Sequence, residues 1–219
     1  MRRYAVIGWG SLIWDLENLA GLVEGGWRMG EGPLLPLEFS RVSPKRKLGL
    51  TLCLDPDHGA DCQSHWILSR RRSVGGAAAD LARRERAVAG RIGAVCVADG
   101  VAQGRLGPVV RLIRDWCLTA GLDGAVWTDL ESNFSQHLGD PFSIDRAVAY
   151  LSGLSGDSRD EAVRYIENAP QTTVTPLRRR LAEEAWWREE AGRVRALAPA
   201  RVPPLSKARR APRGSSAPG

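Results

Sequence analysis

A glycine-punctuated turn near the N-terminus contains the first residues that could do chemistry. The segment reads Ile7-Gly8-Trp9-Gly10-Ser11-Leu12 and follows a short apolar run. Glycines let a backbone turn tightly, and successive N–H groups in such a turn form a concavity that favours anions such as a carboxylate. We therefore predict a substrate cradle made of Gly8, Trp9, Gly10, Ser11 and Leu12. The alternative is a turn that needs its glycines only for shape.

The second candidate is Glu85, which stands in a helical pattern rich in alanine and arginine. At about 100° per residue, Glu85 falls on one stripe with Ala78, Leu81, Val88 and Ile92. An ionised carboxylate buried in an apolar stripe is costly, so its pKa should rise toward neutrality, as a general acid/base requires. In the alternative interpretation, Glu85 forms a structural ion pair with an arginine, either Arg41 or a helical neighbour.

Other kinds of site find less support. Cys53, His58, Cys62 and His65 are four potential zinc ligands, but their spacing matches no common zinc finger, which favours an incidental loop. The glycine turn lacks the third glycine of a dinucleotide-binding fingerprint, because Ile13 stands there. The sequence also contains no Gly-x-Ser-x-Gly elbow, Walker loop or His-Glu-x-x-His motif. We therefore expect neither a metal nor a cofactor.

The periodicity of apolar residues predicts the elements that position these candidates. Strands are expected at residues 4–7, 35–42, 48–54, 64–68, 92–98 and 125–128. Helices are expected at 74–90, 108–120, 143–151, 160–168 and 175–197, with Ser143 as an N-cap and Pro176 at a first helical position. Strands and helices do not alternate regularly. We therefore predict an α+β fold: a small mixed β-barrel or curved sheet flanked by helices, with a helical C-terminal half.

Length and composition favour a single domain. The chain has 219 residues, of which 43% are hydrophobic and 26% charged, as in ordinary globular proteins. We expect one domain over residues 1–198, with a core at 1–107 and a helical extension at 108–198. Residues 199–219 are rich in Pro, Ala, Ser, Gly and Arg, a composition that predicts a disordered tail.

The net charge of +6 arises largely in that tail. Its basic residues are Arg201, Lys207, Arg209, Arg210 and Arg213, and no acid accompanies them. Without those five, the rest of the chain carries +1. A nearly neutral body does not favour nucleic acid as a partner, although the tail could make weak electrostatic contacts with an acidic one.

Several features predict a cytoplasmic protein. The start of the chain does not resemble a secretory signal, because glycines and Asp15 interrupt its apolar run. No stretch approaches the ~20 apolar residues that span a bilayer. The cysteines are scattered and expected to be reduced: Cys53, Cys62, Cys96 and Cys117. We expect a monomer or a homodimer, with Trp186-Trp187 packing the last helix onto the body or onto a second subunit.

Together, the turn and Glu85 resemble the gamma-glutamylcyclotransferase superfamily. Its members commonly place Tyr-Gly-Ser-Leu after a first strand, and one branch reads Gly-Tyr-Gly-Ser-Leu-Ile-Trp. The chain has Gly-Trp-Gly-Ser-Leu-Ile-Trp at residues 8–14 and Leu-Ala-Arg-Arg-Glu at 81–85, where the family has its catalytic glutamate on a helix. The segment Leu37–Ser43 is similar to uncharacterised bacterial members, and the resemblance covers roughly residues 4–98. Trp9 departs from the pattern, because it replaces the usual tyrosine.

The resemblance implies a metal-free and cofactor-free enzyme that acts on a small gamma-glutamyl amide. The α-amino group of the substrate would attack its own side-chain carbonyl and release 5-oxoproline and an amine, with Glu85 as the general acid/base. The family fold is a small mixed β-barrel with surrounding helices. The alternative is a non-catalytic binding or regulatory module on the same fold, which the change at Trp9 and the additional helical half would explain.

Overall fold

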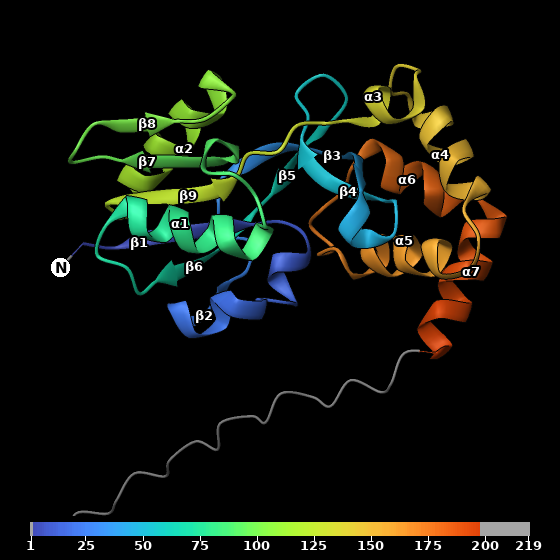
Figure 1. Ribbon diagram of the computed structural model, residues 1–219, viewed down its shortest axis with the longest axis horizontal. Helices are drawn as coiled ribbons and strands as arrows, with labels where there is room; N and C mark the ends of the chain where they lie inside the picture. The colour runs from blue at the N-terminus through green and yellow to red at the C-terminus, as the bar shows by residue number, and fades with distance from the viewer. Residues whose placement is uncertain (1, 198–219) are drawn as a thin grey trace, which may run out of the picture.

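The computed structural model describes residues 2–197, in which strands and helices are mixed up to residue 128 and helices follow alone (Figure 1). The strands are β1 (Tyr4–Gly8), β2 (Val23–Arg28), β3 (Leu34–Ser43), β4 (Gly49–Leu54), β5 (Ala60–Gln63), β6 (His65–Ser69), β7 (Ile92–Cys96), β8 (Val101–Gln103) and β9 (Gly124–Thr128). The α-helices are α1 (Val74–Glu85), α2 (Gly107–Thr119), α3 (Phe134–Leu138), α4 (Ile144–Gly153), α5 (Gly156–Asn168), α6 (Pro176–Glu183) and α7 (Ala185–Leu197). Four short 3-10 helices join them: η1 (Ser11–Ile13), η2 (Glu17–Leu22), η3 (Pro44–Arg46) and η4 (Ala89–Arg91).

Two sheets organise the protein. The larger sheet has six strands in the order β2-β6-β1-β9-β7-β8, and the smaller has three in the order β4-β3-β5. In the larger sheet only β1 and β9 run parallel, with Tyr4 opposite Gly124 and Val6 opposite Val126. The two sheets lie beside each other, and helices α4 to α7 pack at the far side of the smaller one (Figure 1).

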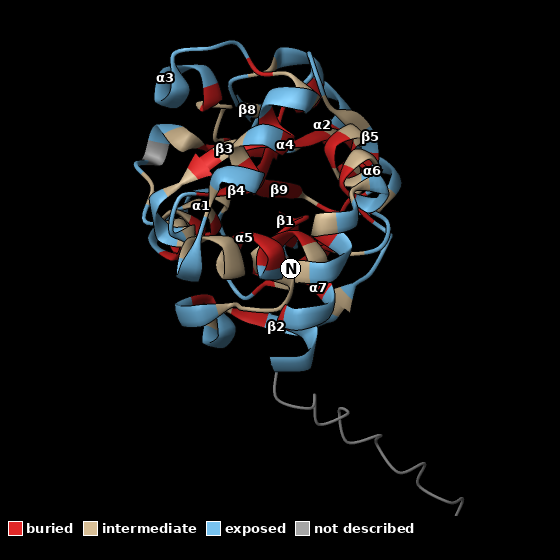
Figure 2. Ribbon diagram, turned by 90° about the vertical axis from the view of Figure 1, so that its right-hand side faces the viewer, coloured by how far each residue is buried: buried red, intermediate tan, exposed pale blue. Residues whose placement is uncertain are grey.

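Helices cover both faces of the larger sheet. Tyr4 and Val6 of β1 belong to the apolar cluster that includes Leu81 of α1, whereas Ala5 and Ile7 belong to the cluster that includes Ile113 of α2. Successive side chains of a strand point to opposite faces, so α1 and α2 lie on opposite sides. This arrangement explains why β1, β7 and the first four residues of β9 are buried without alternation. Strands β1 and β9 lie in the buried interior in Figure 2.

The helical half packs mainly on the smaller sheet. Helix α5 lies against β4, α6 against β3, and α7 against both α5 and α6. Trp187 of α7 is buried, and its indole N–H donates to Glu167 of α5 at 2.9 Å. Trp186 is half-buried, and the guanidinium of Arg159 stacks over its ring in a cation–π contact. This tryptophan pair therefore anchors the last helix to the body of the protein.

The predicted α+β class and the helical C-terminal half are confirmed, but of the two predicted forms of the sheet, a small barrel or a curved sheet, the barrel is wrong. Within residues 2–197 the larger sheet is open, because its edge strands β2 and β8 pair only with β6 and β7. The strands β3, β4 and β5 form a separate sheet instead of closing it. The segment predicted as a helical extension also supplies β9, which lies at the centre of the larger sheet.

Several element boundaries differ from the sequence prediction. The helix expected over residues 74–90 ends at Glu85, because Arg86 adopts a left-handed conformation and its N–H bonds the carbonyls of Ala82 and Arg83. Val88 is therefore 73% exposed, and Ile92 lies in β7. The helix expected over residues 175–197 is interrupted at Glu184, whose backbone is extended.

Three strands and one helix were not predicted. Strand β2 contains two consecutive glycines, β5 is polar and β8 has three residues, so none shows a clear apolar alternation. Helix α3 is a single short segment of five residues. The predicted N-cap Ser143 is confirmed, since its hydroxyl accepts from the Arg146 N–H. Pro176 stands at the start of α6, as predicted, and the Thr175 hydroxyl caps this helix by accepting from the Arg178 N–H. The predicted tail lies outside the described residues.

Packing around Trp127 yields a prediction about stability. A Cβ at Gly93 would lie 2.0 Å from the buried Trp127 ring. We expect Gly93→Ala to lower the free energy of unfolding by at least about 2 kcal/mol, because overpacking a rigid core forces the ring or the strands to shift. Gly153→Ala in helix α4 is the control, since nothing lies within 4 Å of its new methyl group. Equal urea midpoints for the two variants would contradict the packing described for β7 and β9.

Candidate active site

Three elements that are distant in sequence end at one side of the larger sheet. Strands β1 and β9 run parallel and end at Gly8 and Thr128, and α1 packs on both strands and ends at Glu85. Residues that follow the carboxyl ends of neighbouring parallel strands converge in space, which is why ligand sites recur there in open sheets. The turn after β1 and the last residue of α1 are thereby brought together.

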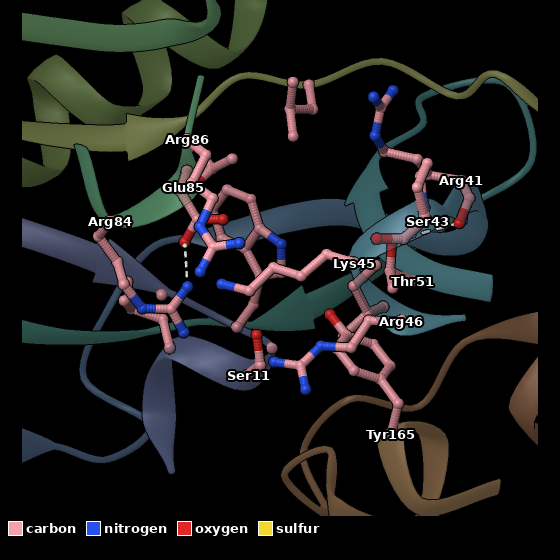
Figure 3. Close-up of a pocket in the computed structure, with 18 of the residues that line it drawn as sticks. Ser11, Arg41, Ser43, Lys45, Arg46, Thr51, Arg84, Glu85, Arg86 and Tyr165 are labelled. Atoms are coloured by element: carbon pink, nitrogen blue, oxygen red, sulfur yellow. Dashed lines mark hydrogen bonds and ion pairs between the residues drawn. The ribbon is translucent and has the colours of Figure 1, made fainter. Parts of the chain in front are cut away.

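A cavity of about 290 Å³ occupies this position. Its wall on the side of the larger sheet contains the predicted cradle, Glu85 and the adjoining arginines, and its opposite wall comes from the β3–β4 connection and α5 (Figure 3). The lining residues that carry polar or charged side chains are Ser11, Arg41, Ser43, Lys45, Arg46, Thr51, Arg84, Glu85, Arg86, Thr128 and Tyr165. Five of these are cationic, and Glu85 is the one acid among the lining residues that the structure describes.

Glu85 is largely withdrawn from water. Its side chain is 19% exposed, and its carboxylate lies 3.5 Å from the Arg84 guanidinium. Burial raises the pKa of Glu85, whereas the charges of Arg84, Lys45 and Arg46 oppose that rise. Burial is the largest of these contributions, so the carboxyl holds its proton more tightly than an exposed glutamate does.

Arg84 forms the ion pair that the alternative interpretation of Glu85 required, whereas Arg41 does not. The Arg84 side chain is fully buried, donates to the Asp15 carbonyl oxygen and lies 3.9 Å from Glu17. Arg41 instead donates to the carbonyl oxygen of Glu131 at 2.7 Å. Arg84 is thus fixed by the segment after the glycine turn, which couples the position of Glu85 to that of the turn.

The glycines of the turn are required for space, not for a left-handed backbone. A Cβ at Gly8 would come within 2.8 Å of the Trp27 ring, and a Cβ at Gly10 within 2.6 Å of the Tyr165 hydroxyl. Neither glycine has a positive φ. The predicted tight turn is present as η1, with the Ile13 N–H donating to the Gly10 carbonyl oxygen at 3.0 Å.

Most of the opposite wall was not predicted from the sequence. Lys45 and Arg46 extend across the cavity toward Glu85 and Ser11, and Tyr165 rises from α5 beneath them (Figure 3). Lys45 pairs with Glu17 at 2.8 Å, and Arg46 pairs with Glu161 at 3.0 Å. The basic residues at 45–47 could have been noticed in the sequence as a possible anion-binding segment. Their position opposite the glycine turn, however, depends on the pairing of β3 with β4.

The four potential zinc ligands do not converge. The Cys53 thiol contacts Ser40, and His58 lies 3.1 Å from Asp55. His65 accepts from the Gly30 N–H and contacts Thr172 through its other nitrogen. Among residues 2–197 no group of three or more His, Cys, Asp and Glu side chains is arranged to hold a metal ion. All four cysteines are buried free thiols, as predicted.

Comparison with protein-family models, with curated proteins and with solved structures gave no match. The assignment to the gamma-glutamylcyclotransferase superfamily therefore stays a prediction that rests on the residues themselves. In the part of the chain that the structure describes, each helix is too short or too polar to cross a bilayer.

The raised pKa of Glu85 predicts a pH-dependent stability. A carboxyl whose pKa is higher in the folded state favours folding most below the unfolded pKa, about 4.3, and this contribution is lost as the pH rises through the folded pKa. We expect the melting temperature of Glu85→Gln, relative to wild type, to increase from pH 4 to pH 8, because glutamine has no charge to bury. Thermal unfolding followed by circular dichroism measures this. Glu189→Gln, at an exposed position of α7, should show no such trend, and a flat difference for Glu85→Gln would contradict the burial of its carboxylate.

Proposed function

We propose that the chain is a gamma-glutamylcyclotransferase-type enzyme that releases 5-oxoproline from a small gamma-glutamyl amide. The observation that carries this proposal is the cavity shared by Glu85 and the turn at residues 8–12, which are about 75 residues apart in the sequence. The family resemblance requires a carboxyl beside a glycine turn, and a cavity with one acid and several cations suits a substrate that brings its own carboxylate.

Glu85 would carry out both proton transfers. The substrate ammonium group first gives a proton to the Glu85 carboxylate, and the neutral amine attacks the γ-carbonyl carbon to close a five-membered ring. The protonated Glu85 then returns this proton to the leaving nitrogen as the C–N bond breaks. The regenerated carboxylate takes the second proton that the ring nitrogen must lose and passes it to the released amine, which departs as an ammonium ion. Substrate atoms are thus divided between 5-oxoproline and the free amine, and Glu85 ends in its starting state. A pKa raised by burial makes the carboxylate a better base for the first step.

The turn would stabilise the oxyanion that develops on the γ-carbonyl oxygen. Gly10, Ser11 and Leu12 line one wall of the cavity. Their backbone N–H groups and the Ser11 hydroxyl would be the donors. Donors that are already in place when charge develops lower a barrier more than donors that must reorient. Trp9 is buried in the core cluster that includes Ala5 and Phe39. Trp9 therefore contributes packing to the cradle, without the phenol of the family motif.

The proposal predicts that Glu85→Gln abolishes turnover. We expect a loss of at least about a hundredfold in the rate of 5-oxoproline formation, because glutamine cannot accept the ammonium proton. The measurement is mass spectrometry of 5-oxoproline after incubation with glutathione and a panel of gamma-glutamyl amino acids and amides. Glu189→Gln is the matched control, and it should turn over at the wild-type rate.

Two outcomes would contradict the proposal in different ways. Undiminished turnover by Glu85→Gln would remove this residue from the mechanism. A gamma-glutamyl ligand that binds the wild-type protein but persists unchanged would favour the non-catalytic binding module. In such a module Glu85 would stay paired with Arg84, which lies 3.5 Å from its carboxylate.

A further inference from the structure

Tyr165 places a hydroxyl group with an unused proton at the cavity. The residue is 6% exposed, and its ring packs edge-on against Trp14 and Phe39. Burial raises the pKa of Tyr165 to about 12, so the hydroxyl group keeps its proton. A phenol that keeps its proton can donate one hydrogen bond. Among the described residues no hydrogen bond from this hydroxyl group to an acceptor is found.

Arg46 provides a second hydrogen-bond donor without a partner, and it lines the same cavity as Tyr165. Its guanidinium lies 5.5 Å from the centre of the Tyr165 ring, and its Nη1 atom donates to Glu161 at 3.0 Å. The Nη2 atom is buried and has no hydrogen-bond partner among the described residues. A buried donor left unpaired is costly, so both groups require an acceptor that the described protein does not supply.

We propose that Arg46 and Tyr165 form the subsite for the α-carboxylate of the substrate, an inference that rests on the proposed function. Both residues line the same cavity. One charged and one neutral donor fit the two oxygens of a carboxylate better than a single amide oxygen. Arg46 and Tyr165 come from η3 and α5, so the helical half of the chain takes part in binding.

The position of Glu85 indicates that Arg46 and Tyr165 bind the α-carboxylate of the substrate and not an anionic group on the leaving amine. The ammonium group that must reach Glu85 is attached to the same carbon as the α-carboxylate, so both groups bind within a few ångströms of each other. Arg46 and Tyr165 both interact electrostatically with Glu85. Ser11 and Leu12 line the same cavity as Arg46 and Tyr165, so the turn retains its own donors for the γ-carbonyl oxygen.

Two ligands that differ only in the carboxylate test this subsite. The first is L-γ-glutamylmethylamide, and the second is 4-amino-N-methylbutanamide, which lacks the α-carboxylate. Their dissociation constants are measured by titration calorimetry with the Glu85→Gln protein, so that turnover does not intervene. We expect the first ligand to bind at least about tenfold more tightly, because its carboxylate forms charge-assisted hydrogen bonds.

Variants in the Glu85→Gln protein assign that preference to the two residues. Arg46→Gln and Tyr165→Phe should each reduce the ratio of the two dissociation constants to about threefold or less, and Arg46→Lys should retain part of it. Arg159→Gln is the matched control, because Arg159 also lies on an aromatic ring and pairs with a glutamate, yet is not among the residues lining the cavity. This control should leave the ratio unchanged.

The outcomes separate this inference from the proposed function. A ratio near one in the parent protein, no binding of the first ligand, or a ratio unchanged by Arg46→Gln and Tyr165→Phe would each overturn the subsite. If wild type still forms 5-oxoproline, the proposed function survives that result. Conversely, Arg46→Gln and Tyr165→Phe could both lose the preference for the first ligand while wild type forms no 5-oxoproline from any gamma-glutamyl compound. That result would support the subsite and refute the proposed reaction.

Discussion

The parallel pairing of β1 with β9 is the constraint on which the site depends. These strands are about 120 residues apart in the sequence, yet their register aligns the carboxyl ends at which the cavity opens. Parallel neighbours need a long crossover connection, and here that connection includes both covering helices. Because α1 is buried on one face and α2 on the other, the central strands can be apolar throughout. The end of α1 is then held beside the end of β1, and Glu85 with it.

The cavity combines a buried acid with a surplus of cations, and the balance between them sets how tightly Glu85 holds its proton. Burial raises the pKa of Glu85, while nearby arginine and lysine side chains lower it. Without burial the cations would make Glu85 a weak base, and without the cations it would bind its proton too tightly to ionise readily. Glu17 pairs with Lys45 and Glu161 with Arg46, so these two acids offset part of the positive charge of the opposite wall.

The helical half is part of the site and not only a scaffold. Helix α5 supports β4 and places Tyr165 against Gly10, so the spacing of the glycine turn is matched to a side chain about 155 residues later. Glu161, on the same helix, holds Arg46. A substitution in α5 can therefore alter the cavity without touching the turn or Glu85.

The sequence by itself determined the α+β class, most strands, the N-caps and the two candidate segments, because these depend on local periodicity and on side chains near in sequence. It could not determine where α1 ends, since Arg86 stops the helix by a backbone conformation that composition does not encode. Nor could it distinguish an open sheet from a barrel, because closure depends on which edges pair. The meeting of Glu85, Arg46 and Tyr165 in one cavity was decided by tertiary structure alone, since contacts over such separations arise only when the sheets and helices pack.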